Sequence, residues 1–130
     1  MDLAGFIAQM RQKNQQSYRD IERLSGGLDH AYVWRLEKGD KGMPSAATID
    51  KLSLALRLNT RQMQVFQLLT RTPIENSLCR LMLAREDLPW EDFEPVATMS
   101  FRDNCPCTEE GWLRLVEMVR SLQRRETAPA

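Results

Sequence analysis

The sequence predicts an all-α protein. Apolar residues recur at helical spacing along most of the chain, and no segment alternates with the period of two that marks a half-buried strand. The 130 residues are 42% hydrophobic and 28% charged, a composition that can bury a core. Ser, Thr or Asp precedes several apolar runs, where such residues cap helices, and glycine or proline often follows. We expect about seven helices.

The first two predicted helices follow one another closely. In the first, LAGFIAQMRQKN, Asp2 can cap the start. Ser17 opens the second, SYRDIERLSGG, with Asp20 at the capping-box position and Ile21 and Leu24 inward. The Gly-Gly pair ends this helix after about two turns, so it must dock on its neighbours to be stable. The apolar stripe of the first helix consists of Leu3, Phe6, Ile7 and Met10.

The third predicted helix spans residues 30–38, HAYVWRLEK. Asp29 is its expected cap, Val33 and Leu36 its inward pair, and Gly39 its end. The segment contains the only histidine of the chain together with a tyrosine, a tryptophan and an arginine. With Val33 and Leu36 facing inward, several polar and aromatic side chains remain on the outer face.

Two further helices complete the first half of the chain. Ser45 is expected to cap AATIDKLSLALRLN, and Thr60 is expected to cap RQMQVFQLLTRT. Pro73 closes this half. The expected inward residues are Ile49, Leu52, Ala55 and Leu56 in the fourth helix, and Met63, Phe66 and Leu69 in the fifth.

In the second half of the chain, the sequence predicts two clear helices with an irregular stretch between them. The stretch LPWEDFEPVATMSFRDNCPC has three prolines and no steady period, so we expect loop with one helical turn at WEDF. Thr108 is expected to cap the last helix, EEGWLRLVEMVRSLQRRE. The helix before the loop places Ile74, Leu78, Leu81 and Met82 at helical spacing.

The charge balance divides the chain at the same point. Residues 1–73 contain 11 Lys and Arg against 7 Asp and Glu, whereas residues 74–130 contain 7 against 11. A basic half beside an acidic half suits a nucleic-acid-binding domain joined to a partner module, although a difference of this size is also ordinary scatter. No run approaches a membrane span and no signal peptide is evident, so we expect a cytoplasmic protein.

Two short helices joined by a glycine-containing turn, within a set of five, are typical of a helix-turn-helix. Residues 3–70 resemble the Cro/C1-type (XRE) helix-turn-helix family. The resemblance rests on RDIERLSG, then YVWRLEKG, then PSAATIDKLSLAL, with Arg11 late in the first helix and Ser17 capping the second. The SGGLD turn is one residue longer than the usual form, and Gln16 stands where the family buries an apolar residue.

The resemblance implies a five-helix lambda-repressor-like domain over residues 1–73. For residues 74–130, which lie beyond the resemblance, our own hypothesis is a small helical dimerisation or effector module. The resemblance further implies double-stranded DNA as partner and residues 30–38 as the recognition helix. The expected base contacts are His30, Ala31, Trp34 and Arg35. The expected DNA-backbone contacts, at helix ends and turns, are Ser17, Tyr18, Arg19, Tyr32, Lys38, Lys41 and Ser45.

Several of these residues have a structural alternative. Arg35 can bond the O6 and N7 of guanine together, or can pair with a neighbouring carboxylate. Trp34 either contacts DNA or folds over the turn as core, and Tyr32 either contacts the backbone or packs. Glu37 lies on the inner side of a short helix, where it needs a partner such as Arg11.

The resemblance also implies a homodimer, because members of this family usually act as dimers and their operators share the two-fold symmetry of the protein. The last helix is the proposed dimer element, and its alternative role is packing within one chain. Its apolar face consists of Trp112, Leu115, Val116, Val119 and Leu122. Among the three cysteines, Cys105 and Cys107 are interpreted as a metal ligand pair, a redox sensor or inert residues, and inert residues are preferred.

The sequence therefore predicts a sequence-specific transcriptional regulator, a dimeric repressor on an inverted-repeat operator, with no cofactor and no metal. An unknown protein or small molecule is a further candidate partner for the C-terminal module. The alternative is a protein-interaction adaptor on the same scaffold, because Tyr18, Tyr32 and Trp34 offer aromatic surface. An enzyme is not expected, since one histidine and no glycine-rich phosphate loop leave little catalytic machinery.

Overall fold

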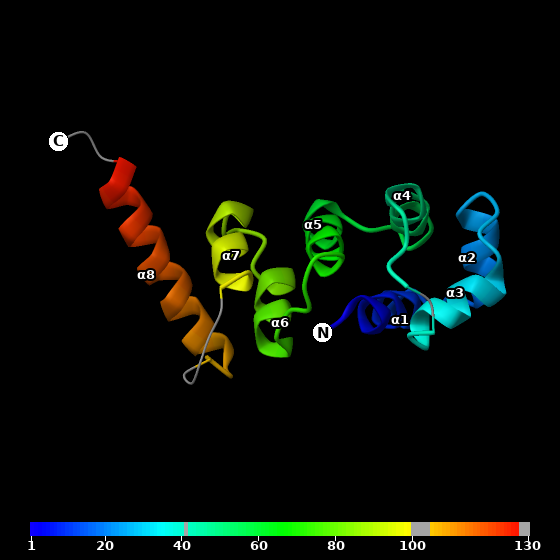
Figure 1. Cartoon of the computed structure of the whole chain (residues 1–130), viewed down its shortest axis with the longest axis horizontal. Coiled ribbons are helices and arrows are strands. Elements are labelled where there is room, and N and C mark those ends of the chain that lie inside the picture. Colours follow the sequence, from blue (N-terminus) through cyan, green and yellow to red (C-terminus); the bar gives the residue numbers. More distant parts are fainter. Residues whose placement is uncertain (41, 100–104, 128–130) are drawn as a thin grey trace. The chain divides into compact units, whose positions relative to one another are not determined.

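The structure is a computed structural model that describes residues 1–40, 42–99 and 105–127, and side chains up to residue 123. Over these residues the chain forms eight α-helices and no strand, which confirms the all-α class (Figure 1). The chain divides into two compact units, Met1–Pro73 and Ile74–Ala130. The division falls where the charge balance changes sign, and each unit is described by itself.

The N-terminal unit is a five-helix arrangement with one apolar core. Helix α2 packs against α3 and α4, and α1 packs against α3 and α5. At the centre the rings of Phe6 and Phe66 stack with centroids 5.3 Å apart. The helices are α1 (Leu3–Lys13), α2 (Tyr18–Leu24), α3 (His30–Glu37), α4 (Ala46–Ala55) and α5 (Thr60–Leu69).

The predicted caps explain where most of these helices begin. The Asp2 carboxylate accepts from the N–H of Gly5, and Ser17 and Asp20 form a reciprocal capping box. Asp29 and Ser45 cap α3 and α4 as expected. The prediction for α5 is wrong by one residue, because Asn59 rather than Thr60 is the cap and forms its box with Gln62.

The inward face of α5 also differs from the prediction. Phe66 and Leu69 are buried as expected, but Met63 is exposed and Val65 and Leu68 are buried in its place. Each step of three residues turns a helix by about 300°, so a strict spacing of three drifts about 60° per step around the axis. Met63 is two such steps from Leu69, so the drift places it away from the face of α5 that packs against the core.

The C-terminal unit contains α6 (Asn76–Ala84), α7 (Trp90–Ala97) and α8 (Glu109–Thr127), with α8 packed against both others (Figure 1). The helical turn expected at WEDF is present, but α7 continues to Ala97, so the expectation of loop directly after this turn is wrong. Pro95 lies inside the helix and cannot donate a backbone hydrogen bond. Phe93 and Val96, three residues apart, are both fully buried, so packing stabilises the helix despite the proline.

Candidate nucleic-acid interface

The position of α3 is fixed by its ends and by its inner face. Asp29 accepts from the N–H of Ala31 at the start, and Val33 and Leu36 are buried in the core. The turn between α2 and α3 contains Gly26 and Gly27, both with positive φ, of 79° and 120°. Glycine adopts such angles at little cost, so the chain reverses tightly and brings the end of α2 beside the start of α3.

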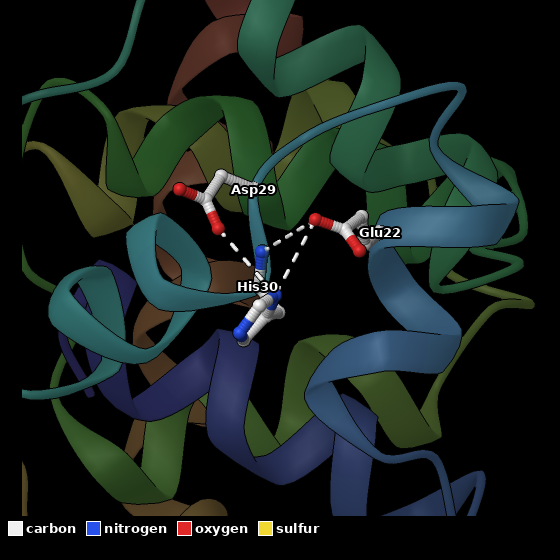
Figure 2. A group of neighbouring side chains, drawn as sticks. All are labelled: Glu22, Asp29 and His30. Carbon is white, nitrogen blue, oxygen red and sulfur yellow. Dashed lines mark hydrogen bonds and ion pairs between the residues drawn. The ribbon is translucent and has the colours of Figure 1, made fainter.

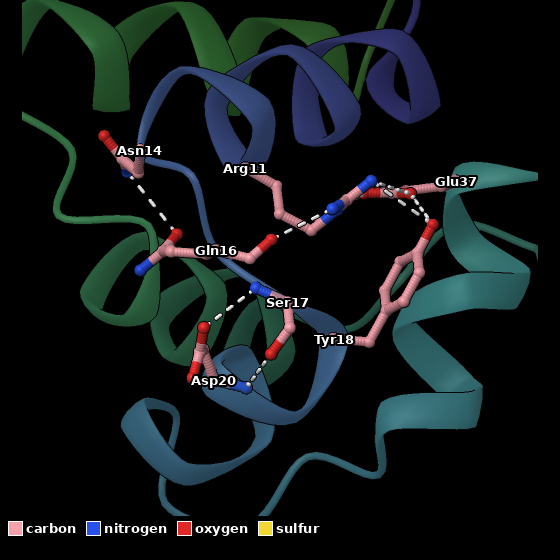
Figure 3. A network of polar contacts seen from close by, with 7 residues as sticks. All are labelled: Arg11, Asn14, Gln16, Ser17, Tyr18, Asp20 and Glu37. Atoms are coloured by element: carbon pink, nitrogen blue, oxygen red, sulfur yellow. Dashed lines mark hydrogen bonds and ion pairs between the residues drawn. The ribbon is translucent and has the colours of Figure 1, made fainter.

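A polar network joins α3 to α1 and α2 (Figure 3). Glu37, whose side chain is 5% exposed, accepts from Arg11 Nε at 2.6 Å and from the Tyr18 hydroxyl at 2.5 Å. The Arg11 guanidinium also lies over the Tyr18 ring, 4.3 Å from its centroid. The expectation that Glu37 is structural and paired with Arg11 is confirmed.

This network changes the ionisation of its members. The hydrogen bond to Glu37 raises the pKa of Arg11, which keeps the cation charged, although burial opposes this. The hydrogen bond that Tyr18 donates to Glu37, helped by burial, raises the pKa of the Tyr18 phenol. Since that hydroxyl proton is already given to Glu37, Tyr18 has none to donate to a phosphate, and its expected side-chain contact with the DNA backbone is unsupported.

Gln16 stands where the resemblance leads us to expect a buried apolar side chain, and the structure shows what its amide does there. Its side chain is buried and its Nε2 donates to the carbonyl oxygen of Ala55 at 2.9 Å. Its own carbonyl accepts from Arg11, and the neighbouring Asn14 donates to the carbonyl of Leu56 at 2.8 Å. The Gln16 amide therefore supplies a hydrogen-bond donor to the Ala55 carbonyl at the end of α4. An apolar side chain at position 16 would leave this carbonyl without that donor.

The outer face of α3 presents aromatic and cationic side chains. Trp34 is 45% exposed, so it does not fold over the turn as core. The Lys38 ammonium lies 5.7 Å from the centroid of the Trp34 ring. Arg35 is exposed, and among the residues that the structure describes it forms no ion pair; the carboxylate of Glu37 is held by Arg11 instead.

His30 begins α3 beside two carboxylates (Figure 2). Its Nδ1 lies 3.4 Å from Oε1 of Glu22 and 3.5 Å from Oδ1 of Asp29. Glu22 comes from α2, eight residues earlier, and was not singled out in the sequence. Only the reversal of the chain at the Gly26–Gly27 turn brings it here, so no local sequence signal points to this cluster.

The remaining residues of the expected interface lie on or near the same pair of helices. Ala31 and Tyr32 are half-buried, and Arg19 is exposed. Ser17 and Ser45 are exposed caps whose hydroxyl oxygens accept from the N–H groups of Asp20 and Thr48. Lys41 lies outside the described residues.

The expected dimer face of α8 is in part the core of the C-terminal unit. Trp112 and Val116 are buried there, and the Trp112 Nε1 donates to Glu75 and Ser77 at 2.9 Å each. These two residues therefore take the alternative role of packing within the chain, because this face of α8 lies against α6 and α7. Leu115 and Val119 are half-buried, and Leu122 is exposed.

The cysteines lie apart from these features. Cys79 is buried and its burial raises the pKa of the thiol to about 11, so it is not a thiolate at neutral pH. Cys105 and Cys107 are exposed and form no disulfide. Among the described residues, the one group of three metal-ligating side chains that converges is Glu22, Asp29 and His30.

The described helices are all too short or too polar to cross a lipid bilayer. Comparison of the chain with protein-family models and with curated protein sequences finds no match.

Proposed function

We propose that the chain is a sequence-specific DNA-binding regulator of the helix-turn-helix class, in which α2 and α3 form the motif and α3 enters the major groove. The carrying observation is the division of α3 into two faces. Val33, Leu36 and Glu37 hold it to the N-terminal unit, while Trp34 and Arg35 project outward. A recognition helix must be held rigidly by the rest of the domain while its outward side chains remain able to contact the bases.

Arg35 is the proposed base-reading residue. Its guanidinium is exposed, and the nearest acid in the sequence that would compete for it, Glu37, is occupied by Arg11. A bidentate pair with the O6 and N7 of guanine contributes about 1–3 kcal/mol of discrimination against the wrong base. Trp34 beside it offers an indole for a thymine methyl group or a sugar.

The proposed backbone contacts surround this helix. Lys38 at its end and Arg19 on α2 are exposed cations, and Ser17 and Ser45 stand at the starts of α2 and α4. Helix starts attract phosphates through their free N–H groups, and lysine or arginine neutralises the phosphate charge. We propose that the protein acts as a dimer on an inverted repeat and represses transcription by covering a promoter.

Selection of bound duplexes from a random pool tests this proposal. We expect one enriched motif with two inverted half-sites, bound more weakly as salt rises because counterions are released. Arg35→Ala should relax selectivity at one position per half-site by about 1–3 kcal/mol. Lys38→Ala should weaken binding to all sequences alike and reduce the salt slope by about one.

Lys51→Ala is the matched control, since Lys51 is an exposed cation on α4 outside the proposed interface. It should leave the motif and the affinity unchanged. The absence of any enriched motif after repeated selection would end the DNA-reading proposal.

A protein-interaction adaptor is the second candidate function, and one observation favours it. Leu54 on α4 is 71% exposed and lines a surface pocket together with Leu58 and Met63. Exposed apolar side chains around a hollow are typical of protein-binding surfaces. Capture of one defined partner that survives high salt and is lost in Leu54→Asp, with no DNA shift, would favour this candidate.

A further inference from the structure

Three metal-ligating atoms converge where the end of α2 meets the start of α3. They are Oε1 of Glu22, Oδ1 of Asp29 and Nδ1 of His30, and all lie within 4.8 Å of one another. Figure 2 shows the two carboxylates directed toward the imidazole from different sides. The two oxygens belong to different elements, so the cluster exists only in the folded unit.

The distances match the coordination shell of a small dication. Ligand atoms about 2.0–2.1 Å from a tetrahedral ion are separated from one another by about 3.4 Å. The Nδ1–Oε1 contact is a hydrogen bond of 3.4 Å and the Nδ1–Oδ1 contact is an ion pair of 3.5 Å, so the ligand atoms already have the spacing that such an ion requires. The two carboxylate oxygens lie within 4.8 Å of each other. Both carboxylates are partly exposed, so they can close on a bound cation.

Backbone hydrogen bonds hold both carboxylates in place. Oε1 of Glu22 accepts from the N–H of His30 at 3.2 Å, and Oδ1 of Asp29 accepts from the N–H of Ala31 at 3.0 Å. A carboxylate oxygen has a second lone pair, so these bonds leave room for a metal bond. Such outer hydrogen bonds orient metal ligands in known sites.

The donor set selects the kind of ion. One imidazole nitrogen and two carboxylate oxygens, with no thiolate nearby, suit Zn²⁺ and the neighbouring divalent transition metals. We propose that Glu22, Asp29 and His30 bind one Zn²⁺-type dication, with water at the remaining position. A neutral imidazole and two carboxylates together carry a charge of −2, which the ion cancels.

The single histidine of the chain makes the test direct. Tag-free, ¹⁵N-labelled full-length protein is titrated with Zn²⁺ near neutral pH while the imidazole nitrogens are followed by NMR. Cys105→Ser/Cys107→Ser is the background, because both cysteines are free and exposed and thiolates in general are zinc ligands. We expect the Nδ1 resonance to shift to completion with one equivalent of Zn²⁺.

Two conservative variants assign the carboxylates. Glu22→Gln and Asp29→Asn keep the size of each side chain, and asparagine still caps α3. Each should weaken Zn²⁺ binding at least tenfold, because a loss of about tenfold or more is typical even when the mutated residue only hydrogen-bonds to a metal ligand. Asp40→Asn removes an exposed carboxylate just beyond the other end of α3 and should change nothing. An unchanged Nδ1 resonance, a shift at Nε2 instead, or equal affinity in all three variants would overturn the proposal.

A consequence for DNA binding rests on the proposed function. Zn²⁺ removes two negative charges at the start of the proposed recognition helix, so the zinc-loaded protein should bind its operator more tightly than the protein in chelator. The difference should vanish in Asp29→Asn. The NMR titration contains no DNA, so loss of operator binding with an intact Nδ1 shift would reject the proposed function and leave the metal site standing.

Discussion

At the scale of single residues, the buried polar groups beside α3 all have partners. Glu37 receives hydrogen bonds from Arg11 and Tyr18, and Gln16 bonds to the carbonyl of Ala55. Burying a carboxylate without a cation costs free energy of folding. The inner face of α3 can therefore contain Glu37 only because these partners are present. Arg11 is thus the residue through which α1 positions the proposed recognition helix.

Removing Arg11 should therefore destabilise the N-terminal unit strongly. We expect Arg11→Met to lower the free energy of unfolding by about 3 kcal/mol, because a nearly buried carboxylate loses its cation. Denaturant titration followed by circular dichroism measures the change. The matched control is Arg23→Met, whose partner Asp20 lies 3.4 Å away on the surface, and it should cost less than about 0.5 kcal/mol. Equal losses in the two variants would contradict this account.

The C-terminal unit has a carboxylate that should make it sensitive to acid. Burial opposes ionisation of Glu75, but hydrogen bonds from Ser77, Trp112 and the N–H of Leu78 outweigh it and hold its pKa below the ordinary value. A carboxyl with a lowered folded pKa stabilises the fold above its unfolded pKa, and that stability is lost as pH falls through the folded pKa.

We accordingly expect the stability of the C-terminal unit to fall as pH drops from about 5 toward 3. In Glu75→Gln this part of the pH dependence should be absent, although the variant is less stable at neutral pH. Trp112 fluorescence in urea titrations at several pH values reports the change, with the other two tryptophans replaced by phenylalanine. A parallel pH dependence in wild type and variant would show that another carboxyl is responsible.

At the scale of elements, α2 and α3 are too short to be stable alone. They contain 7 and 8 residues, so their caps, their turn and their contacts with α1 and α4 determine whether they form. The turn between them depends on glycine. A Cβ added at Gly26 would meet no atom within 4 Å, so the cost of a substitution there comes from the backbone and not from a clash.

Gly26→Ala should lower the free energy of unfolding by about 1–2 kcal/mol, since its φ of +79° lies in the left-handed region. Gly42 is the matched control, because it also has open space around it but no left-handed φ. Gly42→Ala should be neutral or should stabilise by up to about 1 kcal/mol through the unfolded chain. Thermal unfolding of both variants compares them, and a similar loss in each would refute the role of the turn.

At the scale of the whole molecule, the chain contains two units with separate cores and opposite charge. Residues 1–73 have four more cations than acids, 11 against 7, and residues 74–130 have four more acids than cations, 11 against 7. Each unit has its own fully buried aromatic residues, Phe6 and Phe66 in one and Phe93 and Trp112 in the other. DNA binding is proposed for the first unit, and dimer formation for the second.

A fragment of residues 1–73 tests this division of labour. We expect it to fold, with helical circular dichroism and cooperative unfolding, because its core lies within those residues. It should sediment as a monomer at micromolar concentration, whereas the full chain should sediment as a dimer. Leu122→Asp in the full chain should weaken the dimer, since Leu122 is the exposed member of the proposed α8 face. A fragment that remains dimeric would move the interface to the first unit.

Sequence and structure agree most closely for features that neighbouring residues determine, such as the helix caps. The caps at Asp2, Ser17, Asp29 and Ser45 are read from single residues and their near neighbours, and all four are present. They disagree at α7, where the proline rule argues against a helix, but the burial of Phe93 and Val96 offsets the missing hydrogen bond.

By itself, the sequence determined the helical class, the places where most helices begin, and the two faces of α3, because these depend on residues within about one turn of each other. Only the tertiary structure decided that Trp34 faces solvent, that the Tyr18 hydroxyl is committed to Glu37, and that Trp112 is core. It also brought Glu22 to His30. Those outcomes depend on which helices pack together, and periodicity along one helix contains no information about the side chains of another.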